Sequence, residues 1–162
     1  IIAVTLILER PEVEVFACDA SQEALTIDRS NQINLNAGRI HFWAGSWLDA
    51  ISNFQADMII SNPPYIDSSD SNLMSNDTRF EPEVALFAER AGLDAIETIC
   101  SQAREKLKPG GWLLLEHGFN QAEAVINTLI QNGFTECRTY TDHSSNPRVS
   151  TGQLGIGHTH RR

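Results

Sequence analysis

The stretch that decides the fold is Ala56-Asp57-Met58-Ile59-Ile60-Ser61-Asn62-Pro63-Pro64-Tyr65. Its mostly apolar first part stops at a polar residue followed by two prolines, which predicts a buried strand ending in a rigid loop. Each proline fixes φ and removes a backbone donor. The loop is therefore expected to present carbonyl oxygens, the Asn62 amide and the Tyr65 ring in a preset geometry.

This loop has the groups needed to hold a flat –NH2 group. Asn62 Oδ1 and the Pro63 carbonyl can each accept one of its hydrogens, and the Tyr65 ring can cover its π face. Two acceptors aim the delocalised lone pair at an electrophilic methyl group and stabilise the positive charge that develops on nitrogen. In-line placement supplies much of the remaining acceleration. We therefore predict methyl transfer to a planar nitrogen, with four catalytic residues: Asn62, Pro63, Pro64 and Tyr65. A tight turn with a packing tyrosine is the alternative.

The composition is that of a single globular domain with a sizeable core. The chain has 162 residues, of which 41% are hydrophobic and 20% charged. Its net charge of -9 disfavours sequence-independent binding to phosphate backbones, which depends on clustered Lys and Arg. We expect no direct nucleic-acid partner and no membrane partner, since no run approaches the roughly 20 apolar residues of a membrane span. No signal peptide is evident, so a cytoplasmic location is expected.

The cysteines do not have the spacing of a metal site. Cys18, Cys100 and Cys137 are widely separated, and no CxxC or Cys/His ligand pattern occurs. We expect three buried thiols in a reducing compartment and no metal.

Strand and helix patterns alternate along the whole chain. This alternation predicts an α/β sandwich with a mostly parallel sheet, in which the last two strands pair with each other. A turn is expected at Lys108–Gly111, since Pro109-Gly110-Gly111 is a strong turn signal. The expected helices are 1–10, 21–37, 92–107 and 120–131, and the expected strands are 13–18, 40–44, 56–61, 112–116, 134–140 and 148–157.

Polar residues follow several of the predicted strands. In open α/β sheets, ligands bind beyond the carboxyl ends of the strands. Asp19, Ser46-Trp47, the Asn62–Tyr65 loop and Glu116-His117 all fall at such ends. We therefore expect these four segments to meet at one edge of the sheet.

Two of these segments have the residue types of a nucleoside site. An acid at the end of a strand, such as Asp19, can accept both ribose hydroxyls of a nucleoside cofactor. The alternative is an Asp that serves only the turn or the next helix. Trp47 is suited to packing on an adenine ring, the alternative being an ordinary core tryptophan.

Two further segments leave their role open. Glu116-His117-Gly118 has the composition of an acid/base pair, but a strand-end turn with a hydrogen-bonded histidine is the favoured interpretation. Arg79-Phe80-Glu81-Pro82 is either a lid element that faces the substrate or a structural return to the sheet.

The chain resembles a known family, the S-adenosylmethionine-dependent glutamine-N5 methyltransferases of peptide chain release factors (the PrmC/HemK family). NPPY alone also occurs in adenine and guanine methyltransferases, but its combination with RFEP-x-x-AL and a late Arg-Val segment is much more specific. The resemblance covers nearly the whole chain and rests on these motifs: FACDAS (16–21), GSW (45–47), IISNPPYI (59–66), RFEPEVAL (79–86), LLLEHG (113–118) and NPRVSTG (146–152).

The resemblance implies a Rossmann-like, class I S-adenosylmethionine-dependent methyltransferase fold with an antiparallel C-terminal strand pair. It implies that Asp19 holds the cofactor ribose, that Trp47 lines the adenine pocket and that Asn62 touches both the cofactor and the substrate amide. Pro63 to Tyr65 would complete the glutamine pocket. The implied partners are peptide chain release factors, whose Gly-Gly-Gln segment carries the substrate glutamine.

The chain departs from the family pattern in two respects. The family's Gly-rich loop, its strand and the N-terminal helical domain would all lie before Ile1, so an N-terminally truncated methyltransferase domain over residues 1–162 is expected. Ser46 stands where an acidic residue is common in the family.

Two other functions remain open from the sequence. One is a nucleic-acid base N-methyltransferase that uses the same loop, which would need a target-recognition element and a basic surface. The other is an inactive, truncated fragment.

Overall fold

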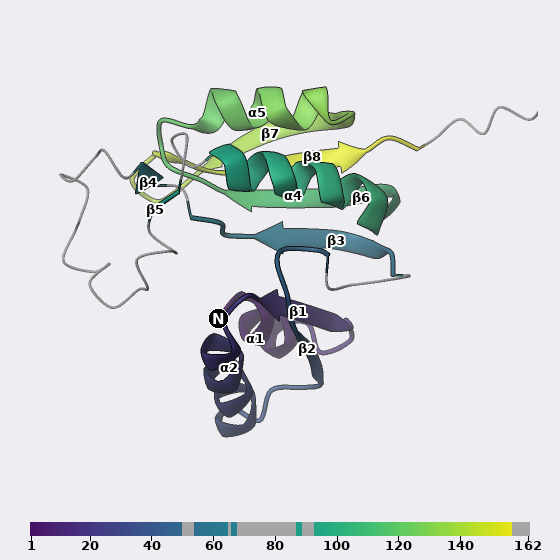
Figure 1. Ribbon diagram of the computed structural model, residues 1–162, viewed down its shortest axis with the longest axis vertical. Coiled ribbons are helices and arrows are strands. Elements are labelled where there is room, and N and C mark those ends of the chain that lie inside the picture. Colours follow the sequence, from purple (N-terminus) through teal and green to yellow (C-terminus); the bar gives the residue numbers. More distant parts are fainter. Residues whose placement is uncertain (50–53, 65, 68–86, 89–92, 157–162) are drawn as a thin grey trace, which may run out of the picture. The chain divides into compact units, whose positions relative to one another are not determined.

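The computed structural model describes residues 1–49, 54–64, 66–67, 87–88 and 93–156. The chain divides into two compact units, Ile1–Phe54 and Gln55–Arg162, here called the first and the second unit (Figure 1). Each unit is described by itself.

The first unit is a pair of parallel strands with two helices. Strands β1 and β2 pair from Val15↔Ile40 to Asp19↔Ala44. Their apolar residues alternate with period 2, so one face of the pair buries Val15 and Ile40 against Val4 and Ile7. The elements are α1 (Ile2–Glu9), β1 (Val15–Asp19), α2 (Gln22–Asn34) and β2 (Ile40–Ala44).

The other face of this strand pair carries stacked aromatic rings. The Phe16 ring contacts the His41 ring, at 4.8 Å between centroids, and the Phe54 ring, at 4.3 Å. The Trp43 ring is nearly parallel to Phe16, at 5.2 Å and 4°. The alternation of the strand residues therefore separates an aliphatic face from an aromatic one.

Helix α2 begins as predicted and ends earlier. Ser21 is its N-cap, with the side-chain oxygen accepting from the Ala24 backbone N–H at 3.1 Å. The predicted end at residue 37, before Gly38, is wrong by three residues, because Asn36 takes the left-handed conformation (φ 47°) that commonly terminates helices.

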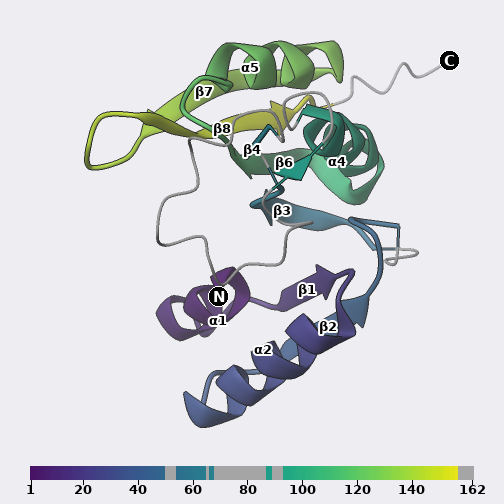
Figure 2. The same cartoon turned by 60° about the vertical axis from the view of Figure 1, so that its left-hand side comes forward.

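The second unit is a four-stranded sheet in the order β3-β6-β8-β7 (Figure 2). β3 and β6 run parallel, whereas β8 lies antiparallel between β6 and β7. The predicted antiparallel pairing of the last two strands is confirmed. The sequence did not predict that β8 also pairs with β6. The elements are β3 (Ala56–Ser61), α4 (Leu93–Lys106), β6 (Leu107–Glu116), α5 (Ala122–Gln131), β7 (Phe134–Thr141) and β8 (Pro147–Leu154), with a short parallel pair β4 (Ile66–Asp67) and β5 (Phe87–Ala88).

The core of the second unit follows from two periodicities. Helix α4 buries Ile96, Ile99, Cys100 and Ala103, the i, i+3, i+4, i+7 pattern of one helix face. Strand β6 buries alternate residues, including Leu113 and Leu115. α4 and α5 pack on each other, α4 contacts β6, and α5 contacts β7 and β8.

The predicted turn at Lys108–Gly111 is wrong, because these residues lie within strand β6. Between the pairs Ala56↔Leu107 and Met58↔Trp112, β3 contributes one residue and β6 contributes four. The extra residues bulge out, and Gly110 there has a φ of 83°. Pro109-Gly110-Gly111 therefore does bend the chain, but β6 pairs with β3 on both sides of this bend.

Among the residues that the structure describes, no helix is long and apolar enough to cross a membrane.

Gly152 of β8 tests how closely β8 packs against β7. A Cβ at this position would lie 2.9 Å from Phe134 Cβ and 3.3 Å from Cys137 Sγ. We expect Gly152→Ala to lower the free energy of unfolding by about 1–3 kcal/mol through overpacking. Gly155→Ala is the matched control, since nothing lies within 4 Å of its added Cβ. Equal denaturation midpoints for the two variants would contradict this packing.

Candidate functional site

In the first unit, the ends of β1 and β2 bring the Asp19 and Trp47 segments together. Asp19 pairs with Ala44, and the Gly45 N–H donates to the Asp19 carbonyl at 3.1 Å. The Cys18 thiol donates to the Trp47 carbonyl at 2.6 Å. Two segments that are separated by a helix and a strand thus form one polar edge.

Asp19 is exposed and only partly engaged. Its Oδ1 accepts from the Ser21 backbone N–H at 2.7 Å, which holds the turn into α2. Within the described part of the chain, its Oδ2 has no hydrogen-bond partner. The carboxylate therefore serves the turn and still presents an acceptor, so the predicted ribose contact remains a prediction.

Trp47 has an unusual backbone. Its φ of 49° lies in the left-handed region, which bulky residues rarely occupy. Its side chain is half-buried, in contrast to a fully buried core tryptophan. Such strain of about 1–3 kcal/mol persists where the surroundings determine it, and it often marks a functional site. The predicted adenine contact stays a prediction.

The thiols are not poised as nucleophiles. Burial and the neighbouring Asp19 charge raise the pKa of Cys18, and burial raises the pKa of Cys137. Burial also raises the pKa of Cys100 to about 12. All three are unpaired, but Cys18 and Cys137 are half-buried, so the prediction of three buried thiols holds only for Cys100. In the described ranges, no cluster of His, Cys, Asp or Glu could hold a metal.

In the second unit, the residues after β3 alternate between buried and exposed positions. Asn62 is exposed, Pro63 is fully buried and Pro64 is half-buried. Tyr65 lies outside the described residues, as does Arg79-Phe80-Glu81-Pro82. Pro63 therefore anchors the loop in the sheet, while the Asn62 amide faces outward.

Strand register places the Glu116-His117-Gly118 turn beside this loop. Ser61 pairs with Leu115, so Asn62 and Glu116 both follow the last pair between β3 and β6. The His117 N–H then donates to the Arg148 carbonyl at 2.9 Å. The Asn62 loop, this turn and the start of β8 thus occupy successive positions at one end of the sheet.

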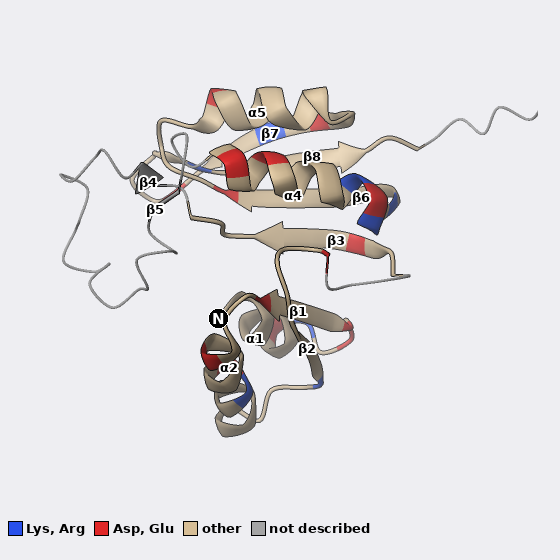
Figure 3. Ribbon diagram, viewed as in Figure 1, with Lys and Arg blue, Asp and Glu red and all other residues tan. Residues whose placement is uncertain are grey.

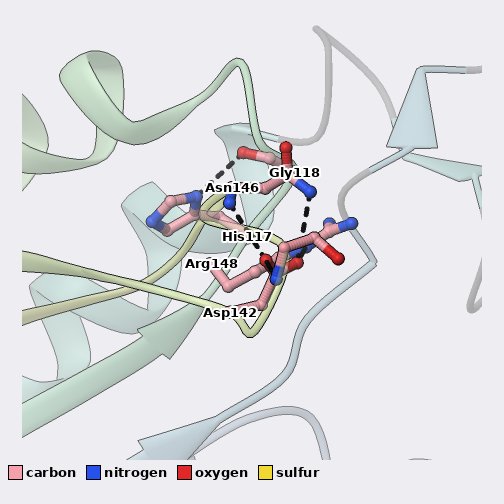
Figure 4. Close-up of polar contacts among 6 residues, drawn as sticks. His117, Gly118, Asp142, Asn146 and Arg148 are labelled. Atoms are coloured by element: carbon pink, nitrogen blue, oxygen red, sulfur yellow. Dashed lines mark hydrogen bonds and ion pairs between the residues drawn. The ribbon is translucent and has the colours of Figure 1, made fainter.

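His117 is a structural residue in this edge. It is fully buried, and its Nδ1 lies 2.9 Å from the Gly118 carbonyl oxygen (Figure 4). Because that oxygen can only accept, Nδ1 carries a proton, and Nε2 lies 2.8 Å from Ser150 Oγ. Ser150 Oγ in turn contacts Thr139 Oγ1 at 2.8 Å. The favoured interpretation of a hydrogen-bonded turn histidine is confirmed.

Asp142 organises the loop between β7 and β8, and sequence reasoning missed it. Its carboxylate accepts from the backbone N–H groups of Ser144 (2.8 Å) and Asn146 (2.9 Å) and from Arg148 Nε (3.3 Å). Ser145, at φ 65°, completes the tight turn. The signal was available, since an Asp followed by Ser, Asn and Pro is typical of a side-chain-stabilised turn.

Comparison with known proteins bears on both units. Residues 1–80 match the Methyltransferase small domain. The chain is 44% identical over 154 residues to a release factor glutamine methyltransferase of Neisseria gonorrhoeae and 41% identical over 153 residues to one of Salmonella typhimurium. Each alignment covers 94% of this chain, and 56% and 55% of the respective relatives.

Over nearly its whole length, the chain is thus similar to release factor glutamine methyltransferases. It spans about half the length of these curated relatives.

Comparison with solved structures bears on the fold. A methyltransferase of Pyrococcus furiosus superposes with a TM-score of 0.70 at 16% identity, over 94% of this chain and 68% of that one. A putative methyltransferase of Streptococcus mutans, solved in complex with S-adenosylhomocysteine, gives a TM-score of 0.55 at 16% identity, over 86% and 75%. The predicted Rossmann-like, class I methyltransferase fold is confirmed.

The Asp142 carboxylate makes the β7–β8 loop sensitive to acid. Hydrogen bonds lower its pKa, the largest contribution coming from the Asn146 backbone N–H. A carboxyl group with a lowered pKa in the folded state contributes stability above its unfolded pKa, about 3.9, and loses it as the pH falls through the folded value. We expect carbon NMR of the carboxyl to show a midpoint below about 3.9. Asp142→Asn should remove this part of the acid dependence of unfolding, and a midpoint above the ordinary value would contradict it.

Proposed function

We propose that the full-length protein containing this chain methylates the side-chain amide nitrogen of a glutamine in peptide chain release factors, with S-adenosylmethionine as the methyl donor. The observation that carries this proposal is that Asn62, directly after β3, is exposed, whereas the next residue, Pro63, is fully buried. The similarity to release factor glutamine methyltransferases supports a glutamine as the substrate, and the motif resemblance implies that it is the glutamine of a Gly-Gly-Gln segment.

Asn62 and Pro63 act on the substrate amide. Asn62 Oδ1 and the Pro63 carbonyl oxygen each accept one N–H of the glutamine side chain, which directs the nitrogen lone pair away from both acceptors. S-adenosylmethionine, when bound, supplies a methyl group on a positively charged sulfur. As the new N–C bond forms and the S–C bond breaks, the two acceptors stabilise the positive charge on nitrogen. The nitrogen then releases one proton to solvent.

The buried Pro63 gives the loop its rigidity. A fully buried ring cannot move without opening a cavity, and proline fixes φ at the same time. The acceptors are therefore held in place before the substrate arrives. Pro64 extends this constraint, and Tyr65 is proposed to cover the amide face.

The first unit is proposed to hold the cofactor. Asp19 retains one carboxylate oxygen for ribose hydroxyls while the other keeps the turn into α2. Trp47, in its left-handed conformation, is proposed to pack on the adenine ring. Residues 1–162 are proposed to act as one methyltransferase domain.

The catalytic role of Asn62 is tested by mapping the methyl group. The full-length protein is incubated with S-adenosylmethionine and a purified release factor, and the modified residue is located by mass spectrometry. We expect methylation of the Gly-Gly-Gln glutamine and a loss of about 100-fold or more in kcat for Asn62→Ala, as for other lost transition-state acceptors.

The control for this experiment is Asn34→Ala, at an exposed asparagine that ends α2, which should leave the rate unchanged. Label entering RNA or DNA instead of the release factor would assign the same loop to a base nitrogen and would refute the proposed substrate.

The cofactor role of Asp19 is tested by calorimetry with S-adenosylmethionine. Asp19→Asn keeps an oxygen for the Ser21 N–H but loses the charge, so we expect the Kd to rise about 10-fold or more, as for a lost charged hydrogen bond. Glu23→Gln removes another exposed carboxylate from the first turn of α2 and should leave the Kd unchanged. An unchanged Kd in Asp19→Asn would refute the ribose contact.

A further inference from the structure

Arg148 lies at the end of the sheet that carries the Asn62 loop. It precedes Val149, which pairs with Glu116, and its carbonyl oxygen accepts from the His117 N–H at 2.9 Å. Glu116 in turn directly follows Leu115, the partner of Ser61. Arg148 and the Asn62 loop are therefore separated by one intervening strand.

The Arg148 side chain is oriented by a single carboxylate. Its Nε donates to Asp142 Oδ2 at 3.3 Å, and its side chain is 35% exposed (Figure 4). In the part of the chain that the structure describes, the terminal nitrogens Nη1 and Nη2 have no hydrogen-bond partner. Asp142 itself is fixed by backbone N–H groups of Ser144 and Asn146. Asp142 thus fixes the guanidinium at Nε, and the terminal nitrogens Nη1 and Nη2 are left to bind another acceptor.

Other described cations of the second unit lie elsewhere. Figure 3 shows basic residues where α4 meets β6, which is the opposite end of the β6 strand. Lys108 there is paired with Asp57 at 2.8 Å. Arg138 lies within β7, opposite Thr151, with its side chain 66% exposed and paired with Glu136 at 3.4 Å. Arg148 is therefore the described cation of this unit that adjoins the Asn62 end of the sheet.

The spacing suits a peptide held across this edge. Two strand spacings separate β3 from β8, which is about 10 Å at ~4.8 Å per strand. Consecutive Cα atoms of a peptide lie ~3.8 Å apart, so 10 Å corresponds to about three residues. If the glutamine amide of a bound peptide reaches Asn62, the main chain about three residues away from that glutamine lies at the position of Arg148.

We propose that Arg148 binds main-chain carbonyl oxygens of the release-factor segment on either side of the modified glutamine. This inference rests on the proposed function. In a Gly-Gly-Gln segment the glycines offer no side-chain groups, so their carbonyl oxygens are the acceptors available to a guanidinium fork. Arg148 thereby recognises the extended backbone, while Asn62 recognises the amide.

The test compares Arg148 variants of the full-length protein on a purified release factor. We expect Arg148→Ala to raise KM for the release factor about 10- to 100-fold, in the range of lost charged hydrogen bonds. The Kd for S-adenosylmethionine should stay within about twofold, since a merely structural defect would weaken both. Arg148→Lys keeps the charge without the fork and should give an intermediate KM.

The matched control is Arg138→Ala, which removes an exposed arginine from the same sheet. It should leave KM unchanged.

If wild-type protein does not methylate the release factor, the proposed function fails. If wild type is active and KM is normal in Arg148→Ala, only the Arg148 proposal is overturned. A parallel loss of cofactor affinity and Tm would also overturn it, in favour of a structural role. If Arg148→Ala does not fold, Arg148→Lys decides, and a normal KM in that variant refutes the contact.

Discussion

The parallel pairing of β3 with β6 is the constraint on which the second unit's edge depends. Once Ser61 lies opposite Leu115, Asn62 leaves β3 at the level of Glu116, the last residue of β6. The antiparallel pairing of β6 with β8 then brings Arg148 to that level. A slip of one residue would reverse the facing of every side chain in β3 and place Pro63 and Asn62 on exchanged sides. The buried Ile59 of β3 opposes such a slip because it would become exposed.

The His117 network is the polar counterpart of this apolar register. A buried imidazole is costly unless both nitrogens are satisfied, and here Gly118 and Ser150 satisfy them. The network also joins three strands, because Thr139 lies on β7, Ser150 on β8 and His117 directly after β6. Its geometry is met only when all three strands hold their register. Hydrogen bonding therefore adds specificity where burial alone would tolerate alternatives.

Local patterns in the sequence predicted the elements well and their interruptions poorly. Features that depend only on nearby residues could be predicted from the sequence. These are the 3.6-residue period of α4, the alternation in β6 and the Ser21 cap. The bulge at Lys108–Gly111 depends on whether the chain returns to β3, which is a long-range pairing. The role of Asp142 was legible as a turn signal, but its contact with Arg148 depends on the hairpin that the turn closes.

The candidate site shows the same division between local and long-range information. Pro63 and Asn62 were predicted from two adjacent prolines after an apolar run, and their opposite burial follows from the end of one strand. His117 and Arg148 were visible only as parts of motifs, because their contact joins residues 31 positions apart in the chain. A residue that the loop chemistry needs at one point can be recognised from neighbouring residues. Arg148, which is proposed to contact the substrate from β8, can be recognised as part of this edge only after the sheet order is known. The inserted position of β8 between β6 and β7 thus adds Arg148 to the edge, because direct pairing of β6 with β7 would have placed the Tyr140 end of that strand there instead.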